Sequence, residues 1–161
     1  MSDHGLIFVN GLQNALAHLG VPIEGMDLEV VIRSDIPIAR GLGSGTAVST
    51  AIIRALSQHF RRDLPVEQVS QLAFRSEVLL HGTPSGVDNT VVAYEEPICF
   101  TRGKPPEALR VSSALHLLIA DTGIPSRTRD TVAHVRQGWA ADRQAFELLF
   151  DEIGAAVEAA R

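Results

Sequence analysis

The chain has 161 residues, of which 45% are hydrophobic and 20% are charged, and its net charge is −5. This composition can bury a sizeable core and argues against disorder. The charges are spread along the sequence without a run of Lys or Arg, so we expect neither a nucleic-acid partner nor a membrane partner. The single cysteine, Cys99, and the lack of a leader pattern at the start indicate a reducing cytoplasm.

The first predicted element is a helix over residues 6–19. Its apolar residues recur at helical spacing, and Gly20 can end it in the left-handed conformation. The stretch DLEVVIRSDIP, residues 27–37, alternates in polarity and then meets a proline, which predicts a strand that leads into a glycine-rich loop. A second helix follows this loop to about residue 60. A third begins near Pro65 and continues to about residue 80.

The second half of the chain predicts strands followed by helices. The stretches TVVAY and PICF, residues 90–94 and 97–100, are typical of a hairpin. The nearly all-apolar ALHLLIAD, residues 114–121, indicates a buried strand. From residue 128 onward the pattern is helical, with weak points at the two glycines, 138 and 154.

A domain boundary is predicted at RGKPPEALR, residues 102–110. Two prolines, a glycine and four charged residues interrupt the apolar pattern there. We therefore expect one domain over residues 1–110 and the start of another over residues 111–161.

The stretch PIARGLGSGTA places three glycines at the start of the second predicted helix. The first N–H groups of a helix lack intrahelical partners and carry a partial positive charge, so they attract anions. Gly41, Gly43 and Gly45 let the backbone approach a phosphate closely, and Ser44 and Thr46 can add hydroxyl groups. The pattern predicts a phosphate cradle, with a tight strand-to-helix turn as the alternative. It is not a Walker loop, because no Lys-Ser or Lys-Thr pair follows the last glycine.

Glu77 lies on the apolar face of the third predicted helix. At ~100° per residue, it falls between Ala73 and Leu80 on the arc that should face the core. A buried carboxylate requires a cation, a metal ion or hydrogen-bond donors. The sequence leaves two explanations open, an ion pair with Arg54 or Arg75 and a role in binding Mg²⁺ or substrate.

The loop HGTPSGVDN delivers Asp88 and Asn89 to an apolar stretch. Gly82 and Gly86 in this loop allow a ligand to come close, so Asp88 is placed to act as a base. An Asx-turn that closes the loop is the structural alternative.

Together these three segments resemble the GHMP kinase superfamily, named for its galactokinase, homoserine, mevalonate and phosphomevalonate kinase members. PIARGLGSGTA is similar to the second motif of that superfamily, Pro-x-x-x-Gly-Leu-Gly-Ser-Ser-Ala. HGTPSGVDN and ADTGIPSRTRDTVAHVRQ look like the mevalonate kinase versions of later segments. The resemblance runs from about residue 26 to about residue 138, and its motifs in this order are more specific than any one of them alone.

The resemblance implies ATP-dependent phosphorylation of the 5-hydroxyl of mevalonate. In that family the glycine loop wraps the nucleotide phosphates, a loop serine and a glutamate hold Mg²⁺, and an aspartate faces the acceptor hydroxyl. By position, Ser44 and Glu77 would be the metal ligands and Asp88 the catalytic residue. The residues that would bind ATP are Arg40, Gly41, Leu42, Gly43, Ser44, Gly45 and Thr46.

Two positions depart from the family pattern. The second serine of the motif is Gly45 here, which leaves Ser44 or Thr46 to replace it as a magnesium ligand. Arg40 stands where a small residue is common, and it either pairs with phosphate or faces solvent.

Family members are considerably longer than this chain, so the resemblance implies an internal fragment of a kinase. The fold expected is α+β, with an incomplete ribosomal-S5-like N-terminal domain followed by the start of the C-terminal domain. Such a fragment should be inactive alone and should self-associate through uncovered apolar faces, which makes a homo-oligomer an open expectation. The alternatives are a sibling kinase acting on homoserine or a sugar, and a non-catalytic nucleotide-binding or partner-binding protein.

Overall fold

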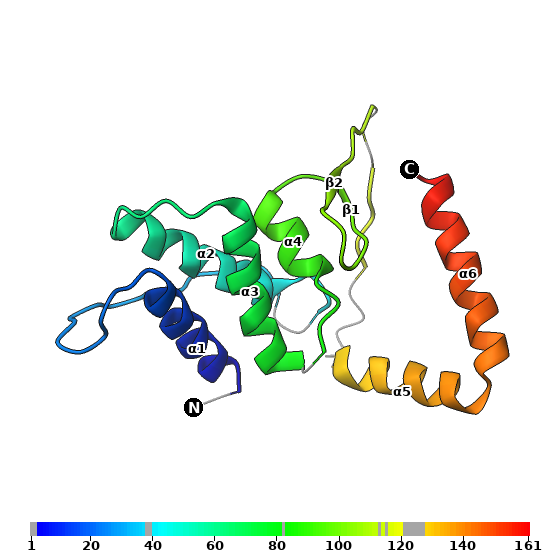
Figure 1. Ribbon diagram of the computed structural model, residues 1–161, viewed down its shortest axis with the longest axis horizontal. Coiled ribbons are helices and arrows are strands. Elements are labelled where there is room, and N and C mark those ends of the chain that lie inside the picture. Colours follow the sequence, from blue (N-terminus) through cyan, green and yellow to red (C-terminus); the bar gives the residue numbers. More distant parts are fainter. Residues whose placement is uncertain (1–2, 38–39, 82, 113, 115, 121–127) are drawn as a thin grey trace.

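The structure is a computed structural model that describes residues 3–37, 40–81, 83–112, 114, 116–120 and 128–161. Figure 1 shows the helices and strands in chain order. They are α1 (Asp3–His18), α2 (Ser44–His59), α3 (Val66–His81), α4 (Val87–Tyr94), β1 (Ile98–Cys99), β2 (Glu107–Ala108), α5 (Thr128–Ala141) and α6 (Arg143–Ala159).

The helices α1 to α4 pack together around one apolar core. Both α1 and α4 contact α2 and α3, which also contact each other. The buried apolar side chains are Ala15, Leu16, Leu19, Ile52, Ile53, Leu56, Val69, Leu72, Ala73 and Ala93. Because every helix of this group contributes to the core, the bundle fixes where the start of α2 lies relative to α3 and α4.

The three predicted helices of the first half are confirmed. The first ends before Gly20, which has a φ of +65°. The second ends at residue 59, and the third begins after Pro65, whose carbonyl oxygen accepts hydrogen bonds from the N–H groups of Gln68 and Val69. Periodic apolar spacing and terminal turn residues were sufficient signals in these segments.

The prediction of a strand over residues 90–94 is wrong, because these residues belong to α4. Asn89, Thr90 and Ala93 are the buried residues of this helix. Their spacing of one, three and four residues places them on one side of a helix, where they pack against α3. This packing overrides the strand preference of Val91 and Val92.

The predicted strands at 27–37 and 114–121 are also wrong for the residues that the structure describes. Residues 27–35 form no regular element, and Val31 is exposed. Residues 116–120 are likewise irregular, and Leu118 is 97% exposed. A strand needs a neighbour to pair its backbone groups, and neither segment has one in the described part of the chain. The apolar patterns of these two segments favour strands, but the sheet that would pair them is not formed among the described residues.

The predicted strand at 97–100 is confirmed in part by β1. Its antiparallel partner is β2, with Ile98 opposite Ala108 and Cys99 opposite Glu107. The partner comes from within residues 102–110, the segment interpreted as a boundary. The described residues are therefore mostly helical, with a single two-stranded sheet among them.

Helices α5 and α6 contact each other near the point where they join and run apart from there (Figure 1). The break between them lies at Asp142, whose side chain accepts a hydrogen bond from the N–H of Ala145 over 3.1 Å and caps α6. The predicted weak points, Gly138 and Gly154, both lie inside helices. Gly138 leaves room for the ring of Phe146, because a Cβ there would lie 2.3 Å from its Cζ atom.

None of the helices that the structure describes is both long enough and apolar enough to cross a bilayer.

Candidate active site

The glycine-rich loop places two glycines in the left-handed region immediately before α2. Gly41 has a φ of +73° and Gly43, the N-cap residue of α2, has a φ of +66°. A Cβ at either position would meet no heavy atom within 4 Å. The backbone conformation therefore requires glycine at both positions, and the space beside it is open to a ligand.

The first turn of α2 has no side-chain cap, because its N-cap residue is a glycine. The N–H of Ala47 bonds to the carbonyl oxygen of Gly43 over 2.9 Å, which starts the helical ladder. The N–H groups that precede it in the first turn can donate hydrogen bonds to an anion. Donors of this kind are what the phosphate cradle expected from the sequence would use, and the cradle itself stays a prediction.

The loop residues differ in how accessible their side chains are. Leu42 is exposed, Arg40 and Ser44 are half-buried, and Thr46 is buried. The hydroxyl of Thr46 therefore points into the protein. Residues 38 and 39 of the same motif lie outside the described residues.

Glu77 is buried in α3, as its position on the helical arc predicts, and is only 4% exposed. The hydroxyl of Thr46 donates a hydrogen bond to Oε1 of Glu77 over 2.7 Å. Arg54, considered as an ion-pair partner of Glu77, bonds the carbonyl oxygen of Ala93 and the carboxylate of Glu95. The contact between Thr46 and Glu77 joins the start of α2 to α3.

The described residues contain no cluster of three or more His, Cys, Asp or Glu side chains that would form an all-protein metal cage. Mg²⁺ rarely uses such a cage when it accompanies a nucleotide. One or two carboxylates, together with substrate phosphates and water, usually hold it. The carboxylate of Glu77 and the hydroxyl of Ser44 are oxygen donors of the kind that Mg²⁺ accepts, so their chemistry fits this ion.

Asp88 lies in the first turn of α4, and its side chain is exposed. The expected loop-to-strand junction is a loop-to-helix junction, because Gly86, with a φ of +95°, is the N-cap residue of α4. A negative charge in the first turn is favourable for the helix dipole. The carboxylate is thus held on a helix and is accessible to a substrate.

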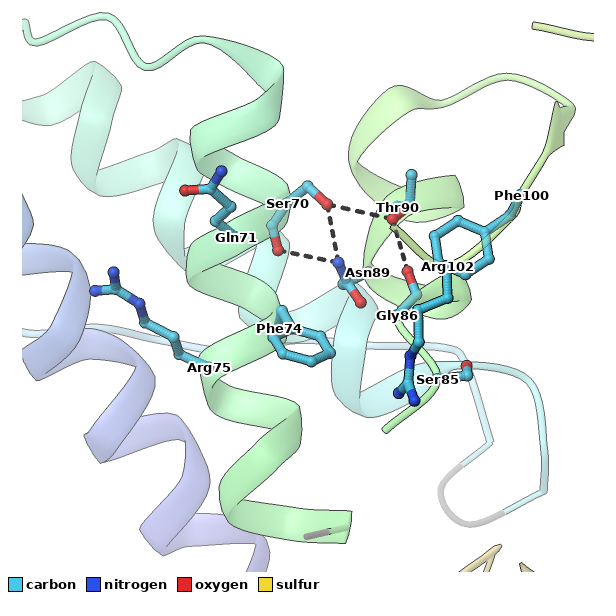
Figure 2. A pocket seen from close by; sticks show the side chains of 10 residues that line it. All are labelled: Ser70, Gln71, Phe74, Arg75, Ser85, Gly86, Asn89, Thr90, Phe100 and Arg102. Carbon is cyan, nitrogen blue, oxygen red and sulfur yellow. Dashed lines mark hydrogen bonds between the residues drawn. The ribbon is translucent and has the colours of Figure 1, made fainter. Parts of the chain in front are cut away.

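A polar network anchors α4 to α3 beside Asp88 (Figure 2). The Asn89 amide donates to the backbone oxygen of Ser70 over 3.1 Å and to its hydroxyl over 2.9 Å. The hydroxyl of Ser70 contacts that of Thr90 at 3.5 Å, and Thr90 donates to the carbonyl oxygen of Gly86 over 2.6 Å. All three side chains are buried, so the network fixes the start of α4 against α3.

A cavity of about 410 Å³ opens beside this network. It is lined by Ser70, Gln71, Phe74, Arg75, Ser85, Gly86, Asn89, Thr90, Phe100 and Arg102. In Figure 2 the guanidinium groups of Arg75 and Arg102 lie on different sides of the cavity. Arg102 donates to the carbonyl oxygen of Pro84, which ties the segment between β1 and β2 to the loop that leads to Asp88.

Sequence reasoning missed Ser70, Phe100 and Arg102 at this place. Each lies far in sequence from the loop it contacts, so no short motif contains the pair. A signal was present for Ser70. Together with Val69 and Ala73 it lies on the inward side of α3, and a polar residue there must have a partner.

Comparison with known proteins places these segments in a family. Residues 7–96, more than half of the chain, match the family described as GHMP kinases N terminal domain. The chain belongs to the GHMP kinase family. The glycine loop, Glu77 and Asp88 all lie within the matched range.

Several curated relatives are similar over a longer stretch. A mevalonate kinase of Thermococcus sibiricus is 35% identical over 132 residues, which cover 82% of this chain and 39% of the relative. A mevalonate kinase of Aeropyrum pernix is 36% identical over 66% of this chain and 33% of the relative. The human mevalonate kinase is 33% identical over 68% of this chain and 31% of the relative. No solved structure matches the chain.

The matched part of the chain thus spans between about a third and two fifths of the length of these relatives.

Proposed function

We propose that this chain supplies the phosphate loop and the catalytic carboxylates of a mevalonate kinase, which transfers the γ-phosphoryl group of ATP to the 5-hydroxyl of mevalonate. The observation that carries the proposal is the contact between Thr46 and Glu77. It joins the glycine loop to the buried carboxylate within the part of the chain that matches the family. The similarity to proteins named mevalonate kinase supports mevalonate as the acceptor.

In this proposal the loop binds the phosphates of ATP through its backbone. The left-handed glycines and the uncapped first turn of α2 direct N–H groups toward open space. Phosphoryl transfer depends mainly on positioning and on neutralising charge, which is what such a loop provides.

Glu77 and Ser44 would hold Mg²⁺ together with the phosphates bound by the loop. When bound, this ion neutralises charge on the phosphate oxygens during transfer. The contribution of the chain is to keep a carboxylate buried and oriented beside the loop.

Asp88 acts as the base in this scheme. The oxygen of the 5-hydroxyl forms a bond to the γ-phosphorus, the bond from that phosphorus to the bridging oxygen of ADP breaks, and the hydroxyl proton passes to the carboxylate of Asp88. Its exposed position at the start of α4 gives a substrate access, and the network around Asn89 limits its movement.

We further propose that residues 1–110 belong to the nucleotide-binding domain, with a ribosomal-S5-like fold, and that residues 111–161 begin the second domain. Because the curated relatives have more than twice the matched length, the complete reaction is proposed for this chain joined to the segments that those relatives contain. We expect the 161-residue chain alone to have a kinase activity near background.

A chimaera tests the proposal. The matched segment of the Thermococcus sibiricus enzyme is replaced by the matched segment of this chain, and ADP release is followed with mevalonate, homoserine and galactose as acceptors. We expect turnover with mevalonate, and phosphorus NMR should identify the product as 5-phosphomevalonate. Preference for another acceptor would instead identify a sibling kinase. Binding of ATP without turnover on any acceptor would identify a non-catalytic binding protein.

A further inference from the structure

The bond between Thr46 and Glu77 has the geometry of a strong hydrogen bond in a dry environment. The oxygen atoms are 2.7 Å apart, and the two side chains are 2% and 4% exposed. A hydroxyl that donates to a carboxylate is a charge-assisted donor, and such bonds are stronger than neutral ones. Low local polarity strengthens it further.

The position of this hydroxyl in the sequence is unusual for the motif. Where the motif reads Ser-Ser-Ala, this chain has Ser44, Gly45 and Thr46. The second hydroxyl has therefore moved by one residue. On a helix, one residue is a rotation of ~100°, so position 46 points in a different direction from position 45. The structure shows that direction, since Thr46 is turned inward onto Glu77.

Thr46 is also well suited to hold a partner still. It is β-branched and lies within the first turn of α2, which restricts its χ1 angle to few values. A bond from such a side chain limits rotation of the carboxylate at the end of the flexible Glu77 side chain. The bond thereby fixes the position of the Glu77 carboxylate relative to the start of α2.

We propose that Thr46 is a positioning residue, whose hydroxyl holds the Glu77 carboxylate in the orientation that binds a divalent cation accompanying the nucleotide. The inference rests on the proposed function, because it takes the phosphates bound by the glycine loop as the source of further ligands to the cation. It assigns to Thr46 a role that acts through Glu77 and involves no contact with the reacting atoms.

The test measures ATP binding to the full chain by calorimetry, once with saturating Mn²⁺ as the probe ion and once with the metal removed. The readout is the dissociation constant of ATP without metal divided by the dissociation constant with Mn²⁺, so that a larger ratio means a larger gain from the ion. We expect Thr46→Val to reduce this ratio about 10-fold, in the range found when outer partners of metal ligands are removed. Thr46→Ser, which keeps the hydroxyl, should retain the ratio of the unaltered chain.

A double-mutant cycle with Glu77→Gln shows whether the effect passes through the carboxylate. If Thr46 acts through Glu77, adding Thr46→Val to Glu77→Gln should cause no further loss. Should Thr46→Val fail to fold, Thr46→Cys, which keeps the size but donates weakly, replaces it and should lower the ratio.

The outcomes separate this inference from the proposed function. An unchanged ratio in the valine or cysteine variant, even with a lower melting temperature, would overturn the positioning role and leave the proposed function standing. If Mn²⁺ does not improve ATP binding by the unaltered chain, both the positioning role of Thr46 and the metal-binding role proposed for Glu77 and Ser44 are overturned, whereas the roles of the glycine loop and Asp88 stand. Failure of the unaltered chain to bind ATP under either condition would contradict both this inference and the proposed function.

Discussion

The glycines at positions 43 and 86 occupy equivalent places, since each is the left-handed N-cap residue of a helix. They differ in their surroundings. A Cβ on Gly43 would meet nothing within 4 Å, whereas a Cβ on Gly86 would lie 3.2 Å from Phe100 and 3.7 Å from Phe74. One glycine is required by its backbone conformation alone, and the other also by close packing.

Substitution by alanine separates the two requirements. Gly43→Ala should cost about 1–2 kcal/mol of unfolding free energy, the penalty of a left-handed residue with a Cβ. Gly86→Ala should cost more, because the ring of Phe100 must also shift. Urea unfolding measures both values, and an equal or smaller loss for Gly86→Ala would contradict the packing argument. Only Gly43→Ala should weaken ATP binding directly.

Tyr94, the last residue of α4, makes a contribution to stability that depends on pH. Burial raises the pKa of its phenol above the ordinary value of 10.0, and the charges of Glu67 and Glu96 raise it further. A pKa that is higher in the folded chain means that the folded state holds the phenolic proton more tightly. This contribution to stability is fully present below the ordinary pKa of 10.0 and is lost as the pH rises from there through the raised pKa of the folded chain.

We therefore expect the urea midpoint to fall as the pH rises above about 10, and Tyr94→Phe to reduce that fall. Tyr94 is the single tyrosine of the chain, so phenolate absorbance reports its titration directly. Titration of this phenol below its ordinary pKa would contradict the expected burial and charge effects.

At the level of single residues, the sequence predicted the inward position of Glu77 correctly, because helical periodicity determines which side chains share a face. It did not predict the bond of Arg54 to the carbonyl oxygen of Ala93, nor the role of Ser70 beneath Asn89. Those contacts join residues far apart in sequence, and their existence depends on how the helices pack.

Among the elements, α4 depends on its anchor to α3. Asn89→Ala removes both bonds to Ser70 and leaves a buried carbonyl oxygen without this donor, which should cost about 1–3 kcal/mol. The matched control is Asp88→Asn, the exposed neighbour in the same turn. It should change stability by less than about 1 kcal/mol, because only a helix-dipole interaction is lost. Equal losses in thermal unfolding would mean that the network does not anchor α4.

The helices α1, α2 and α3 were predictable from sequence, whereas the strands at 27–37 and 114–121 were predicted wrongly, for a physical reason. A helix satisfies its backbone bonds within its own segment, as α1, α2 and α3 do. A strand depends on a partner, and residues 27–35 and 116–120 have none in the described part of the chain. The error at α4 is different, because there Asn89 and its buried neighbours decide the conformation through packing.

For the whole molecule, the exposed apolar side chains predict self-association. Leu117, Leu118 and Ile119 are largely exposed, and so are Leu148 and Ile153 on α6. Large apolar side chains left this exposed favour contacts between chains. We expect concentration-dependent association in sedimentation velocity experiments, together with binding of a hydrophobic dye. A chain that stays monomeric at high concentration and binds no dye would contradict this prediction.

Substitutions on that surface provide the control. Leu118→Lys and Ile153→Lys should each weaken association while leaving the unfolding of the α1 to α4 core unchanged, because neither side chain contributes to the core. Association that both variants retain would place the contact elsewhere.

The most direct measurement of the central claim is phosphoryl transfer to mevalonate by the chimaeric enzyme carrying Asp88→Asn. This change removes the base and its charge at almost constant volume. The account predicts that turnover falls by about 10²–10⁴-fold while ATP binding is retained, since general base catalysis typically contributes this factor. Turnover equal to that of the unaltered chimaera would contradict the assignment of Asp88, and with it the proposal that this chain carries the catalytic carboxylate of a mevalonate kinase.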